Sequence, residues 1–184
     1  SLAFDTSLEE ILPVLCAGGK LVIAKGGGSD IRGIKVIVTE HEVTLISTTP
    51  LVLNELNKEW DGFTTVDKVI SGGDRLQPGH IDAIAKTSQV YNTYGPTEAT
   101  VCVSYHRIDD ISQSENIGKP NPNHQLLILN NDLQLVPRGT YGELYIAGPG
   151  VARGYLNRED ETSKRFINNP FGEDKLFKTG DLVT

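Results

Sequence analysis

Helix-like and strand-like segments alternate along the first half of the chain, and this alternation limits the folds open to it. The expected helices span 30–41, 50–58 and 78–87, and the expected strands span 44–47, 66–71 and 89–92. Strands separated by helices usually pair in parallel, with the helices covering the faces of the sheet. The pattern therefore predicts an α/β fold built on a helix-covered, mainly parallel sheet.

The first 24 residues predict a short helix and a further strand. Asp5, Thr6 and Ser7 are residue types that cap helix N-termini, and the run 8–12 continues with acidic residues in its first turn. Pro13 predicts a kink or an early end of this helix. Two glycines then separate it from the apolar run 20–24, which we expect to be a strand.

The pattern changes after residue 100. Short apolar or alternating runs, separated by Asn-Pro, Asn-Asp and Arg-Gly turn signals, lie at 101–105, 126–129, 133–136 and 143–146. Such runs are typical of antiparallel or barrel-like β structure. We expect an α/β portion over 1–107 and a β-rich, barrel-like portion over 120–184.

Composition excludes several classes of function. The net charge is −7 and the basic residues are scattered, which argues against nucleic-acid binding. No apolar run approaches the ~20 residues of a membrane span, so we expect no membrane partner and a cytoplasmic location. The chain contains no methionine, and we therefore expect it to be a piece of a longer protein.

Cysteine and histidine offer no metal or nucleophile signal. Cys16 and Cys102 lie far apart, and the four histidines are isolated from one another. The spacing predicts reduced thiols that pack as small apolar residues, and no zinc site or nucleophile-base pair. Because the net charge is negative, an anionic ligand would need a metal ion and a few basic side chains positioned near it.

The run 91–100, Tyr-Asn-Thr-Tyr-Gly-Pro-Thr-Glu-Ala-Thr, concentrates functional groups. Gly95-Pro96 forces a turn, so Thr97 and Glu98 behind it are expected to point out together. An aromatic ring, an amide, a hydroxyl and a carboxylate suit a nucleotide bound with Mg²⁺. Gly72-Gly73-Asp74 also follows an expected strand, at the sheet edge where such folds bind ligands. The glycines at 26–28 lack the Gly-Lys-Ser/Thr ending of a phosphate loop and predict a surface turn.

Four motifs resemble those of the adenylate-forming, AMP-binding superfamily, and they are most similar to the adenylation domains of nonribosomal peptide synthetases. The motifs are Phe4-Asp5-Thr6-Ser7, N-T-Y-G-P-T-E at 92–98, G-E-L-Y-I-A-G-P-G-V-A-R-G-Y-L at 142–156 and F-K-T-G-D-L at 177–182. The resemblance spans the chain and implies a central piece of the large N-terminal subdomain. The family's phosphate loop and its C-terminal subdomain with the catalytic lysine would lie outside 1–184, so we expect the isolated piece to be inactive. Phe177 stands where the family usually has tyrosine.

The resemblance implies a two-step activity. ATP and Mg²⁺ would convert an amino acid into aminoacyl-AMP and pyrophosphate, and the acyl group would pass to the phosphopantetheine thiol of a carrier domain. Peptidyl carrier and condensation domains of the same synthetase would be the partners. The implied nucleotide-site roles are Thr97 on phosphate and Glu98 on Mg²⁺ as the catalytic residues, Tyr94 stacked on adenine beside the Gly95 turn, Asn92 at the base edge, Gly73 and Asp74 along the base, and Asp181 on the ribose.

The family's specificity positions fall on a further set of residues. They are Asp5, Thr6, Glu9, Ser47 or its neighbour, Ile70, Gly72, Thr93, Val101 and Cys102. Asp5 would pair with the α-ammonium group that all amino acids share. A carboxylate in a pocket is costly unless it is paired, so Glu9 favours a cationic substrate such as arginine, with lysine or ornithine next. Tyrosine is the main alternative substrate. It also stays open that Glu9 is solvated and that Glu10, or neither acid, faces the pocket.

Two other functions remain open on sequence alone. An acyl-CoA synthetase-like ligase would share the nucleotide motifs, but its acids lack the α-amino group that Asp5 would meet. A non-catalytic nucleotide-binding fragment is the second, and intact Thr97, Glu98 and Asp181 argue against it.

Overall fold

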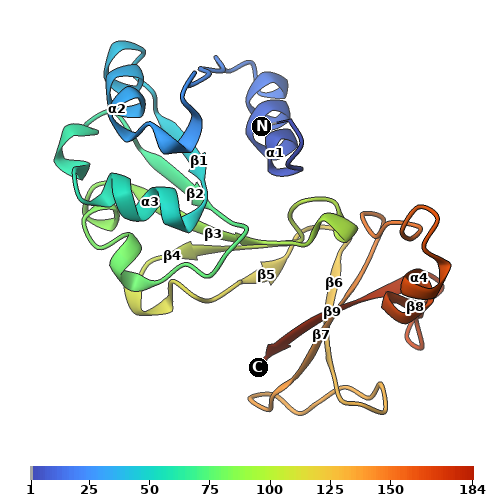
Figure 1. Cartoon of the computed structure of the whole chain (residues 1–184). Helices are drawn as coiled ribbons and strands as arrows, with labels where there is room; N and C mark the ends of the chain where they lie inside the picture. The colour runs from blue at the N-terminus through green and yellow to red at the C-terminus, as the bar shows by residue number, and fades with distance from the viewer. Residues whose placement is uncertain (1) are drawn as a thin grey trace. The chain divides into compact units, whose positions relative to one another are not determined.

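The computed structural model describes residues 2–184 and divides into two compact units (Figure 1). The first unit comprises the chain up to Tyr94 together with Ser104–Lys119, and the second comprises Gly95–Val103 and Pro120–Thr184. The run 91–100 is therefore divided. Its strand belongs to the first unit and its turn to the second.

A five-stranded sheet forms the centre of the first unit, in the order β1-β2-β3-β4-β5. Its strands are β1 (Leu45–Thr48), β2 (Lys68–Ser71), β3 (Gln89–Tyr94), β4 (Ser104–Ile108) and β5 (Lys119–Pro120). Strands β1, β2 and β3 pair in parallel, and β4 runs antiparallel to β3. The helix-covered, mainly parallel sheet that the alternation predicts is confirmed.

Helices α2 (Ile31–Glu40) and α3 (Pro50–Asn57) pack against one face of this sheet (Figure 1). The core between them contains Val38 from α2, Leu53 and Leu56 from α3, and Val69 and Val90 from the strands, all at most 3% exposed. Alternate strand residues face opposite sides, so Ile70 lies on the other face. Asp30 caps α2 by accepting the Gly33 N–H at 2.9 Å, and the glycines before it form a short 3₁₀ turn (Gly27–Ser29) rather than a phosphate loop.

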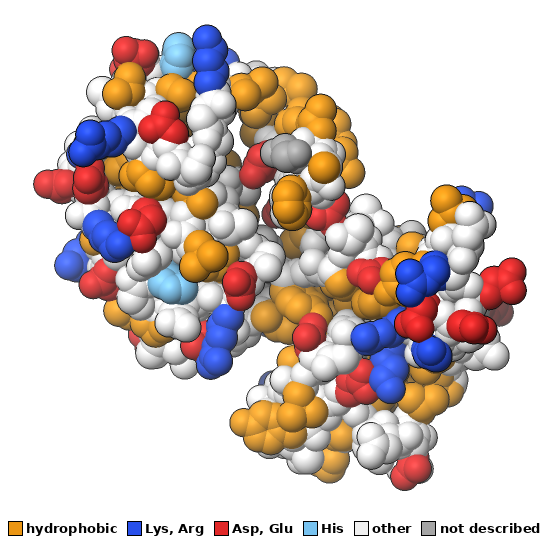
Figure 2. Space-filling view, in the orientation of Figure 1, with side chains coloured by type: hydrophobic (Ala, Val, Ile, Leu, Met, Phe, Trp, Pro, Cys, Tyr) orange, Lys and Arg blue, Asp and Glu red, His pale blue; other side chains and the backbone are white. Residues whose placement is uncertain are grey.

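Helix α1 (Thr6–Cys16) is longer than the sequence indicates, because it continues through Pro13. Leu8, Leu12 and Leu15 stay half-exposed on it, and hydrophobic side chains gather there in Figure 2. The expected strand at 20–24 is wrong. Residues 22–26 instead line a small pocket of about 270 Å³ against α2.

The expected helix at 78–87 is also wrong, since the segment forms two 3₁₀ turns, Pro78–His80 and Ile84–Lys86. Asn57 gives the physical reason. Its side-chain oxygen accepts the N–H groups of Ala83 and Ile84 at 3.0 and 3.1 Å, which a continuous helix would have paired internally. Two further 3₁₀ turns of this unit are Trp60–Gly62 and Ile111–Gln113.

The second unit is a four-stranded antiparallel sheet in the order β6-β7-β9-β8. Its elements are the 3₁₀ turn Thr97–Ala99, β6 (Gln125–Leu129), β7 (Gly142–Ala147), α4 (Glu159–Arg165), β8 (Phe166–Asn168) and β9 (Lys175–Val183). The β-rich character is confirmed, but the sheet is open and forms no closed barrel. The expected strand at 133–136 is reduced to a single bridge between Leu129 and Leu135. None of the helices in residues 2–184 has the length and hydrophobicity needed to cross a bilayer.

Candidate functional site

Four of the predicted substrate-pocket residues lie on one face of the first unit's sheet. The parallel register pairs Ser47 with Ile70 and Ile70 with Tyr91, and Gly72 and Thr93 follow two residues further along the same strands. A Cβ on Gly72 would lie 2.4 Å from the Thr93 hydroxyl oxygen, so these two residues touch. All four are half-buried, on the face opposite the α2/α3 core.

Helix α1 carries the other three predicted pocket residues of this unit. Asp5 occupies the N-cap position, as the sequence predicts, but its side chain makes no capping hydrogen bond. Thr6 and Glu9 are half-buried, whereas the adjacent Glu10 is exposed. Burial, followed by the charges of Glu10 and Asp5, raises the pKa of Glu9. Burial raises the pKa of Glu10 as well, but Glu9 is the less exposed of the two acids.

Replacing Glu9 with glutamine is expected to stabilise the unliganded protein at neutral pH. A carboxyl whose pKa is raised in the folded state binds its proton more tightly there, so its ionised form opposes folding at higher pH. The gain should therefore shrink as pH falls and vanish below the ordinary value of 4.5. Urea unfolding of Glu9→Gln and wild type between pH 4 and 8 measures the difference. A gain that is constant over this range would contradict the assignment.

Asn92 in β3 is buried and holds a loop. Its side-chain amide donates to the backbone oxygens of Ser114 at 2.9 Å and Asn116 at 3.0 Å. Both amide hydrogens are used in this way, so Asn92 fixes the 114–116 segment and offers no donor to a base edge. Gly73 and Asp74 lie exposed just after β2, and Tyr94 is half-buried at the end of β3.

In the second unit, residues 95–102 form a tight turn that closes on itself. A Cβ on Gly95 would lie 2.3 Å from the Val101 backbone oxygen, so no larger residue fits without a backbone shift. Thr100 and Val101 both have positive φ, at 64° and 67°. For a β-branched residue this is a strained conformation of the kind that gathers at functional sites. The predicted pocket residues Val101 and Cys102 are half-buried in this turn, and the Cys102 carbonyl accepts the Asn121 amide at 2.9 Å.

Glu98 is the most tightly ordered of the predicted catalytic groups. The Tyr155 hydroxyl donates to its Oε1 at 2.5 Å, and burial together with this bond raises the pKa of Tyr155 to about 12. In the part of the chain that the structure describes, Oε2 of Glu98 has no hydrogen-bond partner, and the neighbouring Thr97 is exposed.

This arrangement fits the Mg²⁺ that the family resemblance implies. Residues 2–184 contain no cluster of three or more His, Cys, Asp or Glu side chains that could hold a metal by themselves. Mg²⁺ is commonly held by only one or two carboxylates together with water and substrate phosphates. A single carboxylate with one ordered and one available oxygen meets that requirement.

Asp181 lies on a bulge in β9. Glu143 of β7 pairs with Leu182 and Tyr145 pairs with Lys178, so Leu144 alone faces the three residues Thr179, Gly180 and Asp181. Gly180 adopts φ 86°, and its N–H donates to Glu143 Oε1 at 3.0 Å. The Thr179 hydroxyl donates to the Leu144 carbonyl at 2.7 Å. The extra residues push Asp181 out of the strand, where it is exposed.

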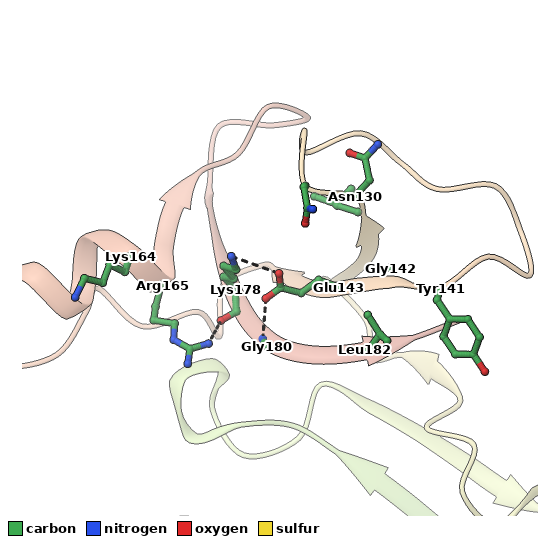
Figure 3. Close-up of a pocket in the computed structure, with 11 residues that line it drawn as sticks. Asn130, Tyr141, Gly142, Glu143, Lys164, Arg165, Lys178, Gly180 and Leu182 are labelled. Carbon is green, nitrogen blue, oxygen red and sulfur yellow. Dashed lines mark hydrogen bonds and ion pairs between the residues drawn. The ribbon is translucent and has the colours of Figure 1, made fainter.

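A pocket of about 620 Å³ lies behind this bulge (Figure 3). Arg165 Nη1 donates to the carbonyls of Lys178 and Thr179, Lys178 pairs with Glu143 at 3.4 Å, and Lys164 pairs with Glu161 at 3.0 Å. Cations and acids accordingly interleave over α4 in Figure 2. Because each cation already has a partner, the pocket is poorly suited to an anion, and its contacts serve to hold the bulge.

Sequence reasoning did not single out Tyr155, Glu143 or Arg165. Tyr155 and Glu143 lie inside the long motif at 142–156, which served only to indicate the family. Polar side chains inside so long a motif are candidates for contacts in the site, so the motif itself could have indicated Tyr155 and Glu143. Arg165 lies outside every motif and carried no such signal.

Comparison with known proteins gives a consistent result. The sequence pattern described as AMP-binding enzyme matches residues 1–156. Bacitracin synthase 2 of Bacillus licheniformis is 41% identical over 188 residues, a match that covers 100% of this chain and 7% of that protein. The structure of holo-AB3403, a four-domain nonribosomal peptide synthetase bound to AMP and glycine, has a TM-score of 0.90 at 31% identity and covers 99% of this chain and 14% of that one. The Klebsiella oxytoca NpsA N-terminal subdomain in complex with 3-hydroxybenzoyl-AMSN has a TM-score of 0.86 at 26% identity, over 99% of this chain and 49% of that one. The chain thus spans a small part of the synthetases it matches.

Proposed function

Because this chain belongs to the AMP-binding enzyme family, we propose that it is part of an adenylation domain that activates an amino acid for nonribosomal peptide synthesis. In the proposed reaction a carboxylate oxygen of the amino acid attacks the α-phosphorus of ATP. A bond forms between this carboxylate oxygen and the α-phosphorus. The bond between the α-phosphorus and the oxygen that bridges to the β-phosphorus breaks, and pyrophosphate leaves. The protein's part in such a step is to align the reactants and stabilise phosphate charge.

The observation that best supports this proposal is the hydrogen bond that fixes the Glu98 carboxylate. Tyr155 fixes one oxygen of Glu98, and the other is available to a cation beside the exposed Thr97 hydroxyl. Bound there, Mg²⁺ would neutralise charge on the phosphates. Thr97 would donate to a phosphate oxygen, and Asp181 would accept hydrogen bonds from the ribose hydroxyls.

We further propose that the activated acyl group is transferred to a carrier domain. The phosphopantetheine thiol loses its proton and attacks the acyl carbon, and AMP leaves as the thioester forms. Support comes from the relatives, which are large peptide synthetases matched over only 7% and 14% of their lengths. Carrier and condensation domains would then be the partners of this domain.

For the substrate we propose an amino acid with a cationic side chain, arginine first. Glu9 is half-buried with a raised pKa, so its ionised form lacks a compensating charge in the described residues. A guanidinium would supply that charge and bind the carboxylate through two hydrogen bonds. The small residues Ser47, Gly72 and Thr93 on the sheet face leave room for a long side chain. Tyrosine remains the second candidate because its hydroxyl also donates.

The test is ATP–pyrophosphate exchange by the complete protein, with a panel of amino acids and a fatty acid. Arginine should support the fastest exchange. In Glu9→Gly the advantage of arginine over neutral amino acids should fall by about 100-fold, in line with the loss of one partner of a buried, hydrogen-bonded charge pair.

Glu10→Gly is the matched control, because it removes the adjacent but exposed acid and should leave the preference unchanged. Tyrosine preferred over arginine in wild type would overturn the cationic assignment. Fatty-acid-dependent exchange without amino-acid-dependent exchange would overturn the proposed function.

A further inference from the structure

The segment 148–155 lies against the turn that carries Glu98, and three hydrogen bonds between described residues join them. The Ala152 N–H donates to the Glu98 carbonyl at 2.8 Å, and the Thr100 hydroxyl donates to the Gly150 carbonyl at 2.7 Å. The third is the hydrogen bond from Tyr155 to the Glu98 carboxylate. The first two hold the backbone of the turn, and only the third acts on the acidic group itself.

Tyr155 is itself held from two sides. Its backbone N–H donates to the Thr162 hydroxyl of α4 at 2.9 Å. Its ring packs edge-on against Phe166 of β8, with ring centroids 5.4 Å apart and an interplanar angle of 77°. These contacts leave the hydroxyl little freedom, so the direction of its hydrogen bond to Glu98 is set by the sheet rather than by the turn.

We propose that Tyr155 is a positioning residue for the metal-binding carboxylate of Glu98. By donating to Oε1 it selects one rotamer of Glu98 and leaves Oε2 to meet a divalent cation. Mg²⁺ demands near-octahedral geometry, so a carboxylate that rotates freely is a poorer ligand than one held in place. Groups that orient a metal ligand in this way typically contribute 10–100-fold to metal affinity. The inference rests on the proposed role of Glu98 in binding Mg·ATP.

The experiment measures Mn²⁺ binding to the complete protein by electron paramagnetic resonance, in the presence of a non-hydrolysable ATP analogue. Tyr155→Phe keeps the ring and removes only the hydroxyl. Its Mn²⁺ affinity should fall by about 10-fold, within the range for such groups, and the KM for Mg·ATP should rise accordingly. The KM for the amino acid should not change.

Tyr145→Phe is the matched control. Tyr145 lies in the same unit, and its hydroxyl also donates to a carboxylate, Glu143, at 3.3 Å. The Tyr145→Phe substitution should leave the Mn²⁺ affinity at the wild-type value. A Tyr155→Phe protein that melts earlier but binds Mn²⁺ as tightly as wild type would show that the hydroxyl only stabilises packing, and would overturn the proposal.

Thr162→Val provides a second route if Tyr155→Phe folds poorly. It removes the acceptor of the Tyr155 N–H and should weaken Mn²⁺ binding in the same direction by a smaller factor, whereas unchanged binding would count against the inference. Pyrophosphate exchange by the wild-type protein distinguishes a failure of the proposed role of Tyr155 from a failure of the proposed function. If wild type exchanges pyrophosphate normally and Tyr155→Phe binds Mn²⁺ normally, only the role of Tyr155 fails, and if wild type shows no exchange, the proposed function itself fails.

Discussion

Replacing Glu98 with glutamine in the complete protein should lower kcat/KM for Mg·ATP by about 100-fold or more, which corresponds to at least ~2.7 kcal/mol of transition-state stabilisation. The substitution preserves shape and removes a negative charge from the only oxygen of the side chain that the structure leaves open to a cation. The neutral amide still accepts the Tyr155 hydroxyl, so the turn should keep its conformation. Initial rates of ATP–pyrophosphate exchange against Mg·ATP concentration measure the effect.

The amino acid provides the internal control for this experiment. Its binding, measured by calorimetry without nucleotide, should be unchanged in Glu98→Gln, because the substitution keeps the shape of the turn that also holds the proposed pocket residues Val101 and Cys102. Glu159→Gln, at an exposed acid in the first turn of α4, is the matched variant and should behave as wild type. Wild-type kinetics for ATP in Glu98→Gln would show that this carboxylate does not serve the nucleotide.

Sequence patterns predicted the parallel sheet well, because the physical signals there are local. β-Branched runs such as Val69-Ile70 act within a few residues, and β1, β2 and β3 lie close to the expected strand ranges. The family resemblance is also confirmed by the matching AMP-binding pattern over residues 1–156. Long motifs report a family reliably because many positions must agree.

Several elements that the sequence does not predict correctly depend on partners that are distant in sequence. The 78–87 segment has a helical pattern, but Asn57 accepts the N–H groups that a helix needs. The sequence does not predict strand β9, because Gly180 interrupts the alternation of apolar and polar residues. The pairing with β7 shows that Thr179–Asp181 form a bulge. The apolar run 20–24 has the composition of a strand but pairs with no strand among the described residues.

The sequence proposes residues for the candidate site, and their roles stay predictions, but it does not predict their contacts. The motif predicts Glu98 as the metal-binding acid, yet nothing in the sequence links it to Tyr155, 57 residues away. Asp5 lies at the N-cap of α1, but its side chain makes no capping hydrogen bond. Side-chain hydrogen bonds depend on distances of tenths of an ångström, and a sequence pattern does not carry that information.

Substitution of Asn92 is the second change with a large expected effect. The structure gives Asn92 a role in holding a loop, whereas the motif implies contact with the base. Asn92→Leu keeps the size of the side chain but leaves the Ser114 and Asn116 carbonyls without their donor. The Ser114 carbonyl is buried, and a buried acceptor left unpaired costs about 1–3 kcal/mol. Asn116 is exposed, so water can replace its donor, and the free energy of unfolding should fall by about 1–3 kcal/mol. Urea unfolding of the complete protein measures this loss.

Asn54→Leu is the control for Asn92→Leu, since the Asn54 amide reaches only the adjacent Glu55 on the surface of α3, and its substitution should change stability by less than about 0.5 kcal/mol. At low urea, where Asn92→Leu remains folded, its KM for ATP should match wild type, because in this geometry the amide faces the protein rather than a ligand. The opposite outcome, with unchanged stability and a KM for ATP raised tenfold or more, would restore Asn92 to the base edge. Either result separates a residue that holds the 114–116 segment from one that touches the nucleotide, and the motif N-x-Y-G-P-T-E alone does not make that distinction.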